Sequence, residues 1–242
     1  MNWIKTKPIA HRGIHSNKNG IPENSLLAFH TAIKKKYPIE LDIHMLADDN
    51  FAVFHDDNLE RMCGENIKIN ELTSLQLKKY NLLSTKEKIP LLQEVFNLIN
   101  GQVPILIEIK SYGKSKDGFK CLYNMLSNYN GEFAIQSFNP FILGWFVKNA
   151  PSILRGQLAS RSKNPKILHI PKIVLKHFGL NFISKPNFIS CDFNDIPNKK
   201  VEKFKSLGKS ILCWTIRNEQ EYKKIQSFCD NIIFENFLPE IH

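Results

Sequence analysis

Three features are scarce or missing in this sequence of 242 residues, and each absence excludes a class of protein. No run approaches the roughly 20 consecutive apolar residues that a membrane-spanning helix needs. The opening residues, MNWIKTKPIAHRG, contain no apolar stretch of signal-peptide length. The 5 cysteines are an odd number, and they form neither a CxxC pair nor a Cys/His cluster with zinc spacing. We therefore expect a soluble cytoplasmic protein with reduced cysteines.

Negative charge is also in short supply. The chain has 33 Lys and Arg residues against 23 Asp and Glu residues, which gives a net charge of +10. A basic surface attracts nucleic acid, anionic lipid or phosphorylated metabolites. The lysines are scattered, with short runs only at 34–36 and 199–200, as is usual on solvated helix faces. Charge therefore indicates an anionic partner without selecting one.

Strand-like and helix-like segments alternate along the whole chain, and no low-complexity stretch or linker separates them. With 43% hydrophobic residues, the sequence has ample material for one core, and we expect a single domain over 1–242. Helical periodicity predicts helices at 24–36, 73–81, 91–100, 115–129, 139–149, about 165–180, 197–207 and 218–229. Short apolar runs predict strands at 8–11, 38–44, 51–55, 103–109, 133–137, 153–158, 187–191, 210–215 and 231–235.

The third predicted strand differs from the others in its connection. Only LADDN, about five residues, joins it to the second strand, whereas a parallel crossover needs roughly a dozen. Residues 51–55 should therefore form a hairpin arm that brings His55 near Asp42. The remaining eight strands, joined mostly by helices, predict a (β/α)8 TIM barrel, with an open doubly wound sheet as the alternative. The tail FLPEIH is too short for a complete last helix.

Charged side chains occur inside two segments that otherwise resemble buried strands. Glu40 and Asp42 in IELDI lie two residues apart and therefore share one face, and Glu108 and Lys110 in ILIEIK repeat this spacing. Active sites of such barrels lie at the carboxyl ends of the strands. We expect these four residues to face a common basin there, with the other polar residues of predicted strand ends, His11, Arg12 and His55.

The residue types in this basin suggest phosphate chemistry at a metal ion. Three carboxylates without sulfur favour a hard cation such as Mg²⁺, Ca²⁺ or Mn²⁺. Arginine and lysine beside them suit a phosphate group, and two histidines can supply an acid and a base near neutral pH. A structural Glu108–Lys110 ion pair is an alternative interpretation, and the acidic residues at 48–49 and 56–57 are interpreted as ordinary turn residues.

Seven stretches, in chain order, carry a more specific resemblance. IAHRG, PENSLLAF, IELDIHML, FAVFHDDNLERMCG, LIEIK, QSFNP and CWTIRN resemble the motifs of the glycerophosphodiester phosphodiesterase family, from residue 8 to about 239. The family fold is a TIM barrel, in agreement with the strand pattern. The resemblance implies hydrolysis of glycerophosphodiesters to sn-glycerol 3-phosphate and an alcohol.

The resemblance also implies a role for each site residue. Glu40, Asp42 and Glu108 would hold one divalent cation, while His11 and His55 would be the catalytic acid/base pair. Arg12 and Lys110 would bind the phosphate, Glu23 would support the site as a ligand or from behind the ligands, and Phe138 and Trp214 would line the substrate pocket.

Other functions remain open at this point. A lysophospholipase D-like hydrolase would use the same barrel, and the apolar, basic stretch 165–182 could touch a membrane, although helix packing or a dimer contact is favoured. A non-catalytic anion-binding module would be expected to have lost catalytic residues, and none is lost. A glycosidase would leave the two histidines, Arg12 and Lys110 without roles. The expected partner is thus a small glycerophosphodiester rather than nucleic acid.

Overall fold

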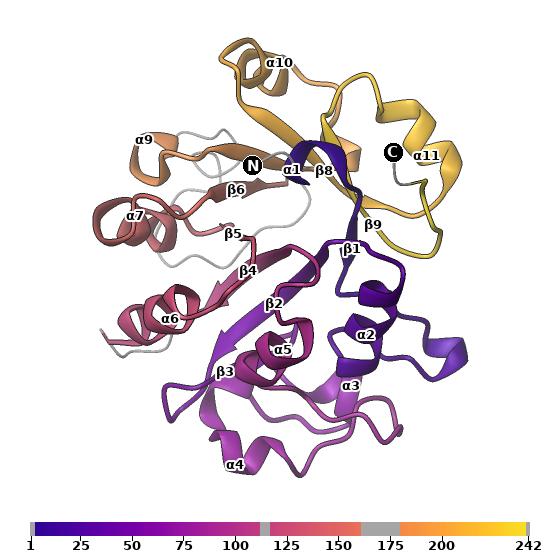
Figure 1. The fold of residues 1–242 in the computed structure, drawn as a ribbon, viewed down its shortest axis with the longest axis vertical. Helices are drawn as coiled ribbons and strands as arrows, with labels where there is room; N and C mark the ends of the chain where they lie inside the picture. The colour runs from indigo at the N-terminus through magenta and orange to yellow at the C-terminus, as the bar shows by residue number, and fades with distance from the viewer. Residues whose placement is uncertain (1–2, 112–116, 161–179, 241–242) are drawn as a thin grey trace. The chain divides into compact units, whose positions relative to one another are not determined.

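The computed structural model describes residues 3–111, 117–160 and 180–240 (Figure 1). The chain divides into two compact units, Ala10–Phe133 on the one hand, and Met1–Ile9 with Ala134–His242 on the other. All nine predicted strands form. Residues 165–179 of the expected helix at about 165–180 lie outside the described residues.

The unit Ala10–Phe133 is built on a central buried strand. This strand, β2 (Ile39–Met45), pairs in parallel with β1 (Ile9–His11) and with β4 (Ile105–Ser111). It also pairs antiparallel with β3 (Phe51–Val53), with Ile43 opposite Val53. The hairpin predicted from the short LADDN connection is therefore confirmed. However, β3 ends two residues before His55, and β4 extends past its predicted end, so that Lys110 lies within the strand.

Helices and longer irregular segments connect these strands. Ser25 starts α2 (Leu26–Lys34) because its hydroxyl accepts a hydrogen bond from Ala28 N. α2 packs against α5 (Leu92–Ile99), as Figure 1 shows. The other helices are η1 (Asn17–Asn19), α3 (Glu60–Cys63), η2 (Ile69–Glu71), α4 (Ser74–Leu77) and α6 (Gly118–Ser127).

The segment after β3 carries His55 and has a small apolar core of its own. Phe54, Leu59 and Met62 are buried in it, together with residues of η2 and α4 such as Ile69 and Leu77. Buried side chains of this size each stabilise a fold by roughly 1.5–3 kcal/mol. This cluster anchors the short helices α3, η2 and α4, and it holds the chain on either side of His55 in place.

The second unit carries five parallel strands in sequential order. They are β5 (Phe133–Ser137), β6 (Arg155–Ala159), β7 (Phe188–Asp192), β8 (Ser210–Ile216) and β9 (Asn231–Phe234). Among its described residues, the helices are α1 (Trp3–Thr6), α7 (Pro140–Asn149), α9 (Asn181–Ser184), η3 (Phe193–Asp195), α10 (Lys199–Ser206) and α11 (Glu219–Ile225). The predicted Asn139 cap and Pro140 start of α7 are confirmed.

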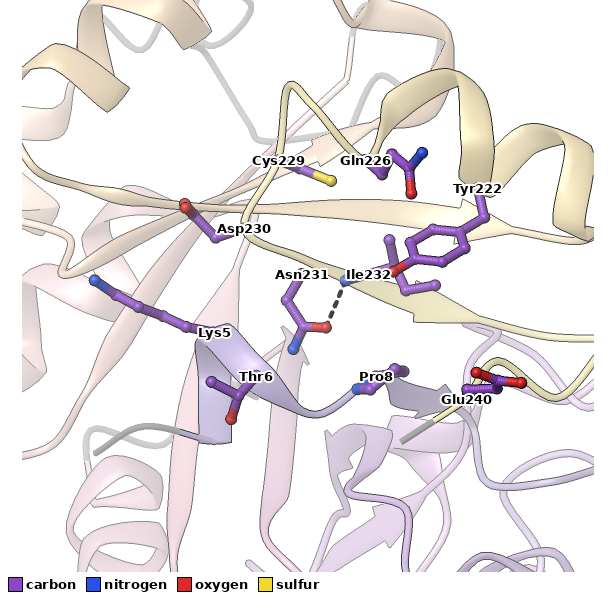
Figure 2. Close-up of a pocket in the computed structure, with 10 residues that line it drawn as sticks. All are labelled: Lys5, Thr6, Pro8, Tyr222, Gln226, Cys229, Asp230, Asn231, Ile232 and Glu240. Carbon is purple, nitrogen blue, oxygen red and sulfur yellow. Dashed lines mark hydrogen bonds between the residues drawn. The ribbon is translucent and has the colours of Figure 1, made fainter. Parts of the chain in front are cut away.

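One buried amide ties the start of the chain to β9. Asn231 Nδ2 donates hydrogen bonds to the carbonyl oxygens of Ile4 and Lys7 at 2.9 and 2.7 Å. Its Oδ1 accepts one from Ile232 N at 2.9 Å (Figure 2). A cavity beside it is lined by residues of α1, α11 and β9 and by Glu240. Because the polar atoms of Asn231 all have partners within the chain, the amide has a structural role.

Several short helical turns were not predicted from sequence, namely α1, η1, α3, η2, α9 and η3. Each has only three or four residues, which is too short to produce a recognisable helical period. In the part of the chain that the structure describes, no helix is long and apolar enough to cross a membrane.

Two glycines provide a test of how tightly the turn after β1 is packed. Gly13 and Gly64 both have φ of +77°, where a side chain costs about 1–2 kcal/mol. A Cβ on Gly13 would lie 2.9 Å from the carbonyl carbon of Ala28, whereas one on Gly64 would meet nothing within 4 Å. Gly13→Ala should therefore reduce the free energy of unfolding by at least about 1 kcal/mol more than Gly64→Ala. Urea unfolding of both variants measures the difference. Equal decreases in the free energy of unfolding would show that the turn after β1 can accommodate the added Cβ without strain.

Candidate active site

Three buried carboxylates lie side by side on β2 and β4. Glu40 and Asp42 are each 1% exposed, and Glu108 is 6% exposed. Strand register places Asp42 opposite Glu108 and Glu40 opposite His11. The prediction from sequence that all three lie at carboxyl ends of strands is wrong, because Asp42 and Glu108 lie in the middle of β2 and β4, and Glu40 is the second residue of β2. Glu40 nevertheless pairs with His11, the last residue of β1. β2 is the longer strand, and its remaining residues extend beyond the end of β1 and pair with β3.

The three carboxylates offer a donor set that suits a hard cation. One oxygen from each of Glu40, Asp42 and Glu108 lies within 4.8 Å of the others. Asp42 Oδ1 and Glu108 Oε1 are buried and accept no well-aligned hydrogen bond, although the ammonium of Lys110 lies within reach of both oxygens. Buried oxygens with unused lone pairs are costly unless a cation or donor reaches them. Oxygen-only ligation of this kind fits Mg²⁺, Ca²⁺ or Mn²⁺.

Two cationic side chains compensate the buried negative charge. Lys110 Nζ lies 2.9 Å from Asp42 Oδ1 and 2.7 Å from Glu108 Oε1. Arg12 donates its backbone N–H to Glu40 Oε2 at 3.1 Å, and its Nε lies 3.3 Å from Asp42 Oδ2. Burial would lower the pKa of Lys110, but the two adjacent carboxylates outweigh it and raise that pKa. The Glu108–Lys110 ion pair considered from sequence thus exists, as part of a larger charged group.

The two carboxylates of β2 have opposite pKa shifts. Burial, together with repulsion from Asp42 and Glu108, raises the pKa of Glu40 well above its ordinary value. Burial would also raise the pKa of Asp42, but the positive charges of Lys110, His55 and Arg12 hold it well below its ordinary value. At Asp42 the attraction of the nearby cations thus outweighs burial, whereas at Glu40 burial and the repulsion of the other two carboxylates outweigh it.

An unusual backbone conformation places Arg12 against these carboxylates. Arg12 and Asn24 both have positive φ, 55° and 53°, which is rare outside glycine and is tolerated best by asparagine. Asn24 N donates to Arg12 O at 3.0 Å, and its side-chain Nδ2 donates to Asp42 Oδ2 at 2.9 Å. No role was predicted for Asn24 from the sequence, although it lies within the PEN motif. Strained residues of this kind cluster at functional sites.

The two candidate catalytic histidines lie at the edge of the same group. His11 Nε2 is 4.0 Å from Glu40 Oε2. His55 Nδ1 is 2.6 Å from Asp56 Oδ1, and the backbone carbonyl of His55 lies 3.2 Å from His44 Nε2. Burial lowers the pKa of His44 to about 4, so that His44 is neutral and its Nε2–H donates to this carbonyl. His44, for which the sequence indicated no role, thus fixes the backbone of His55.

Asp56 is not merely the turn residue expected from sequence. It accepts from His55 with one oxygen and from Arg61 Nε with the other, at 2.6 Å in each case. Arg61 also contacts Glu23, whose Oε1 accepts from Arg12 at 2.6 Å. The predicted supporting position of Glu23 agrees with this geometry. A carboxylate directly after a candidate catalytic histidine is the signal that could have identified Asp56.

The remaining predicted site residues belong to the second unit. Phe138 follows β5, and Trp214 lies in β8. Their rings make an edge-to-face contact with centroids 5.8 Å apart. The structure therefore brings these two aromatic residues together, while their role in lining a substrate pocket stays a prediction.

Comparisons with known proteins place the chain in a family. The model of the Glycerophosphoryl diester phosphodiesterase family matches residues 11–237. Glycerophosphodiester phosphodiesterase 1 of Bos taurus is 28% identical over 277 residues, covering 98% of this chain and 81% of that protein. Lysophospholipase D GDPD1 of Homo sapiens is 35% identical over 118 residues, covering 43% of this chain and 36% of that protein.

A solved structure shows the fold. A phosphodiesterase from Oleispira antarctica, in complex with the product sn-glycerol-3-phosphate, superposes with a TM-score of 0.79 at 21% identity, covering 96% of this chain and 93% of that one. The predicted (β/α)8 TIM barrel with its extra hairpin strand is confirmed. The chain belongs to the glycerophosphoryl diester phosphodiesterase family and is a phosphoric diester hydrolase of the glycerophosphodiester phosphodiesterase class.

Proposed function

We propose that the chain hydrolyses glycerophosphodiesters to sn-glycerol 3-phosphate and an alcohol, with one divalent cation held by Glu40, Asp42 and Glu108. The observation that carries the proposal is the cluster of three buried carboxylate oxygens within 4.8 Å of one another, flanked by Arg12 and Lys110. We also propose that residues 1–242 act as one catalytic domain, since the family match covers 11–237.

The charges of the group suit this assignment. The three carboxylates, when ionised, carry one more charge than Arg12 and Lys110 together compensate. A divalent cation would convert this single net negative charge into a single net positive one. A phosphodiester carries one negative charge, so that its binding would leave the site neutral. When bound, the cation would polarise a phosphoryl oxygen of the substrate.

The chain's own residues would do the remaining chemistry. Arg12 and Lys110 would stabilise negative charge on the phosphoryl oxygens. Either His11 or His55 would take a proton from the attacking oxygen, and the other would protonate the leaving alcohol. His55 Nδ1 already has Asp56 as its partner, so that its Nε2 is the atom available for proton transfer.

A lysophospholipase D-like activity is the second candidate. It is favoured by the 35% identity over 118 residues to Lysophospholipase D GDPD1. The two activities differ in whether the substrate carries an acyl chain. All residues that the resemblance assigns to catalysis are present in the sequence, which argues against a non-catalytic anion-binding module.

A substrate panel tests the proposed function. Water-soluble glycerophosphodiesters and lysolipids would be assayed side by side for released sn-glycerol 3-phosphate, lysophosphatidic acid and free alcohol. We expect turnover of the soluble diesters with release of glycerol 3-phosphate. Turnover confined to lysolipids would favour the second candidate, and no turnover of either class with Mg²⁺, Ca²⁺ or Mn²⁺ would contradict both.

Removal of divalent metal should abolish activity. Chelation with EDTA should stop turnover, and Mg²⁺, Ca²⁺ or Mn²⁺ should restore it. Because the ion would bind only the folded site, its addition should also raise the melting temperature. Glu108→Gln should lose this shift, whereas Glu71→Gln, a change at an exposed residue paired with Lys68, should keep it. Full turnover after exhaustive chelation would overturn the metal assignment.

Each proposed acid/base residue should be needed for turnover. His11→Ala and His55→Ala should each lower kcat by roughly 10²–10⁴-fold, the usual range for loss of a general acid or base. Both variants should remain folded, since neither imidazole is fully buried. His30→Ala, at an exposed position of α2, is the matched control and should leave kcat unchanged. Near-normal turnover by either site variant would show that its histidine is not the acid or base.

A further inference from the structure

We propose that Asp56, Arg61 and Glu23 form a charged relay that positions the ring of His55 and couples it to Arg12. The relay consists of the ion pairs His55–Asp56, Asp56–Arg61, Arg61–Glu23 and Glu23–Arg12. None of the three relay residues needs to touch the reacting atoms, and each acts through a neighbour. The inference rests on the proposed role of His55 as an acid or base; it adds Asp56 and Arg61 to the site as positioning residues and gives the supporting residue Glu23 a specific task.

The first link fixes the orientation of the imidazole. Asp56 Oδ1 lies 2.6 Å from His55 Nδ1, a short distance typical of a charge-assisted hydrogen bond. A proton on Nδ1 is thereby held toward Asp56, which leaves Nε2 free to exchange a proton. The backbone of His55 is held separately by His44, so that loss of Asp56 should release the ring without moving the chain.

Arg61 prevents Asp56 from turning away. Its Nε donates to the second oxygen of Asp56 at 2.6 Å, so that both carboxylate oxygens are engaged. Burial would raise the pKa of Asp56, but the hydrogen bonds from His55 and Arg61 keep it below its ordinary value. Asp56 therefore stays ionised throughout the neutral range, as an orienting partner for an imidazolium requires.

The same guanidinium clamps Glu23. Arg61 Nη2 donates to Glu23 Oε1 at 2.7 Å, and Nη1 donates to Oε2 at 3.1 Å. With Nε on Asp56, the planar group thus holds two carboxylates at once. Lysine cannot reproduce such a fork, because it is a single point charge on a flexible stem. Arg61 sits on the one-turn helix α3, which the apolar cluster around Met62 holds in place.

Glu23 completes the connection to the phosphate-binding side of the site. Its Oε1 also accepts from Arg12 Nη1 at 2.6 Å, while Arg12 Nε lies 3.3 Å from Asp42 Oδ2. Positive and negative groups therefore alternate from His55 to Asp42. Surface ion pairs of this type contribute only about 0–1 kcal/mol to stability. Since Arg61 is half-exposed, the arrangement is better explained by the geometry it imposes than by stabilisation of the fold.

Double variants distinguish positioning from general stabilisation. Asp56→Asn alone should lower kcat by roughly 10–100-fold, as is usual for residues that support a catalytic group, with KM changed less than about threefold. Added to His55→Ala, the same change should have almost no further effect on kcat, because it acts through the missing imidazole. Asp48→Asn is the matched control: Asp48 accepts hydrogen bonds from Ser74 and should leave kcat unchanged.

Variants of Arg61 test the fork. Arg61→Lys should resemble Arg61→Met in kcat rather than the wild type, because charge alone does not position two carboxylates. Both should raise KM more than Asp56→Asn does, since Arg61 also orients Glu23 against Arg12. Melting temperatures of all variants should stay within a few degrees of the wild type, and wild-type kcat in Arg61→Lys would contradict the fork.

Failure of the relay can be told apart from failure of the proposed function. If His55→Ala retains normal kcat, the acid/base role of His55 is wrong and the relay has nothing to position. If His55→Ala is inactive but Asp56→Asn keeps wild-type kcat, the proposed function stands and the relay is overturned. A further loss of kcat when Asp56→Asn is added to His55→Ala would likewise overturn it.

Discussion

The site depends on the compensation of three buried carboxylates by two cations. Unpaired charges at 1–6% exposure would be too costly to keep in the interior of a fold. Lys110 reaches across from β4 and contacts Asp42 and Glu108, while Arg12 contacts Glu40 with its backbone and Asp42 with its side chain. Removal of either cationic side chain would leave a buried carboxylate without compensation. Such a change usually lowers the free energy of unfolding by several kcal/mol.

The fold supplies this arrangement through strand register and one strained turn. Parallel pairing of β2 with β1 and β4 sets Glu40 level with His11 and Asp42 level with Glu108. The positive φ of Arg12, followed by Gly13, turns the backbone N–H of Arg12 toward Glu40. The strain is tolerated because neighbouring groups fix it, among them Asn24, whose N–H binds the Arg12 carbonyl. The charge compensation of the buried carboxylates therefore depends on the backbone conformation of Arg12.

Sequence alone predicted much of this site, because strand periodicity determines which side chains share a face. The i, i+2 spacing of Glu40 with Asp42 and of Glu108 with Lys110 was enough to group them, and loop length was enough to place His55. Side-chain pairing beyond that spacing was not predictable. Asp56 looked like a turn residue, and its contact with Arg61 depends on how α3 packs on its apolar cluster. The pairing of Glu40 with the last residue of β1 was likewise not predictable, because periodicity does not determine the residue at which a strand ends.

The most direct test of the account is an anomalous-scattering experiment on crystals grown with Mn²⁺ and sn-glycerol 3-phosphate. The account predicts one strong peak coordinated by Glu40, Asp42 and Glu108, with the phosphate bound to the ion and contacted by Arg12 and Lys110. A map with no peak at these carboxylates, while Lys110 keeps its contacts with Asp42 and Glu108 and the phosphate is bound elsewhere, would contradict it.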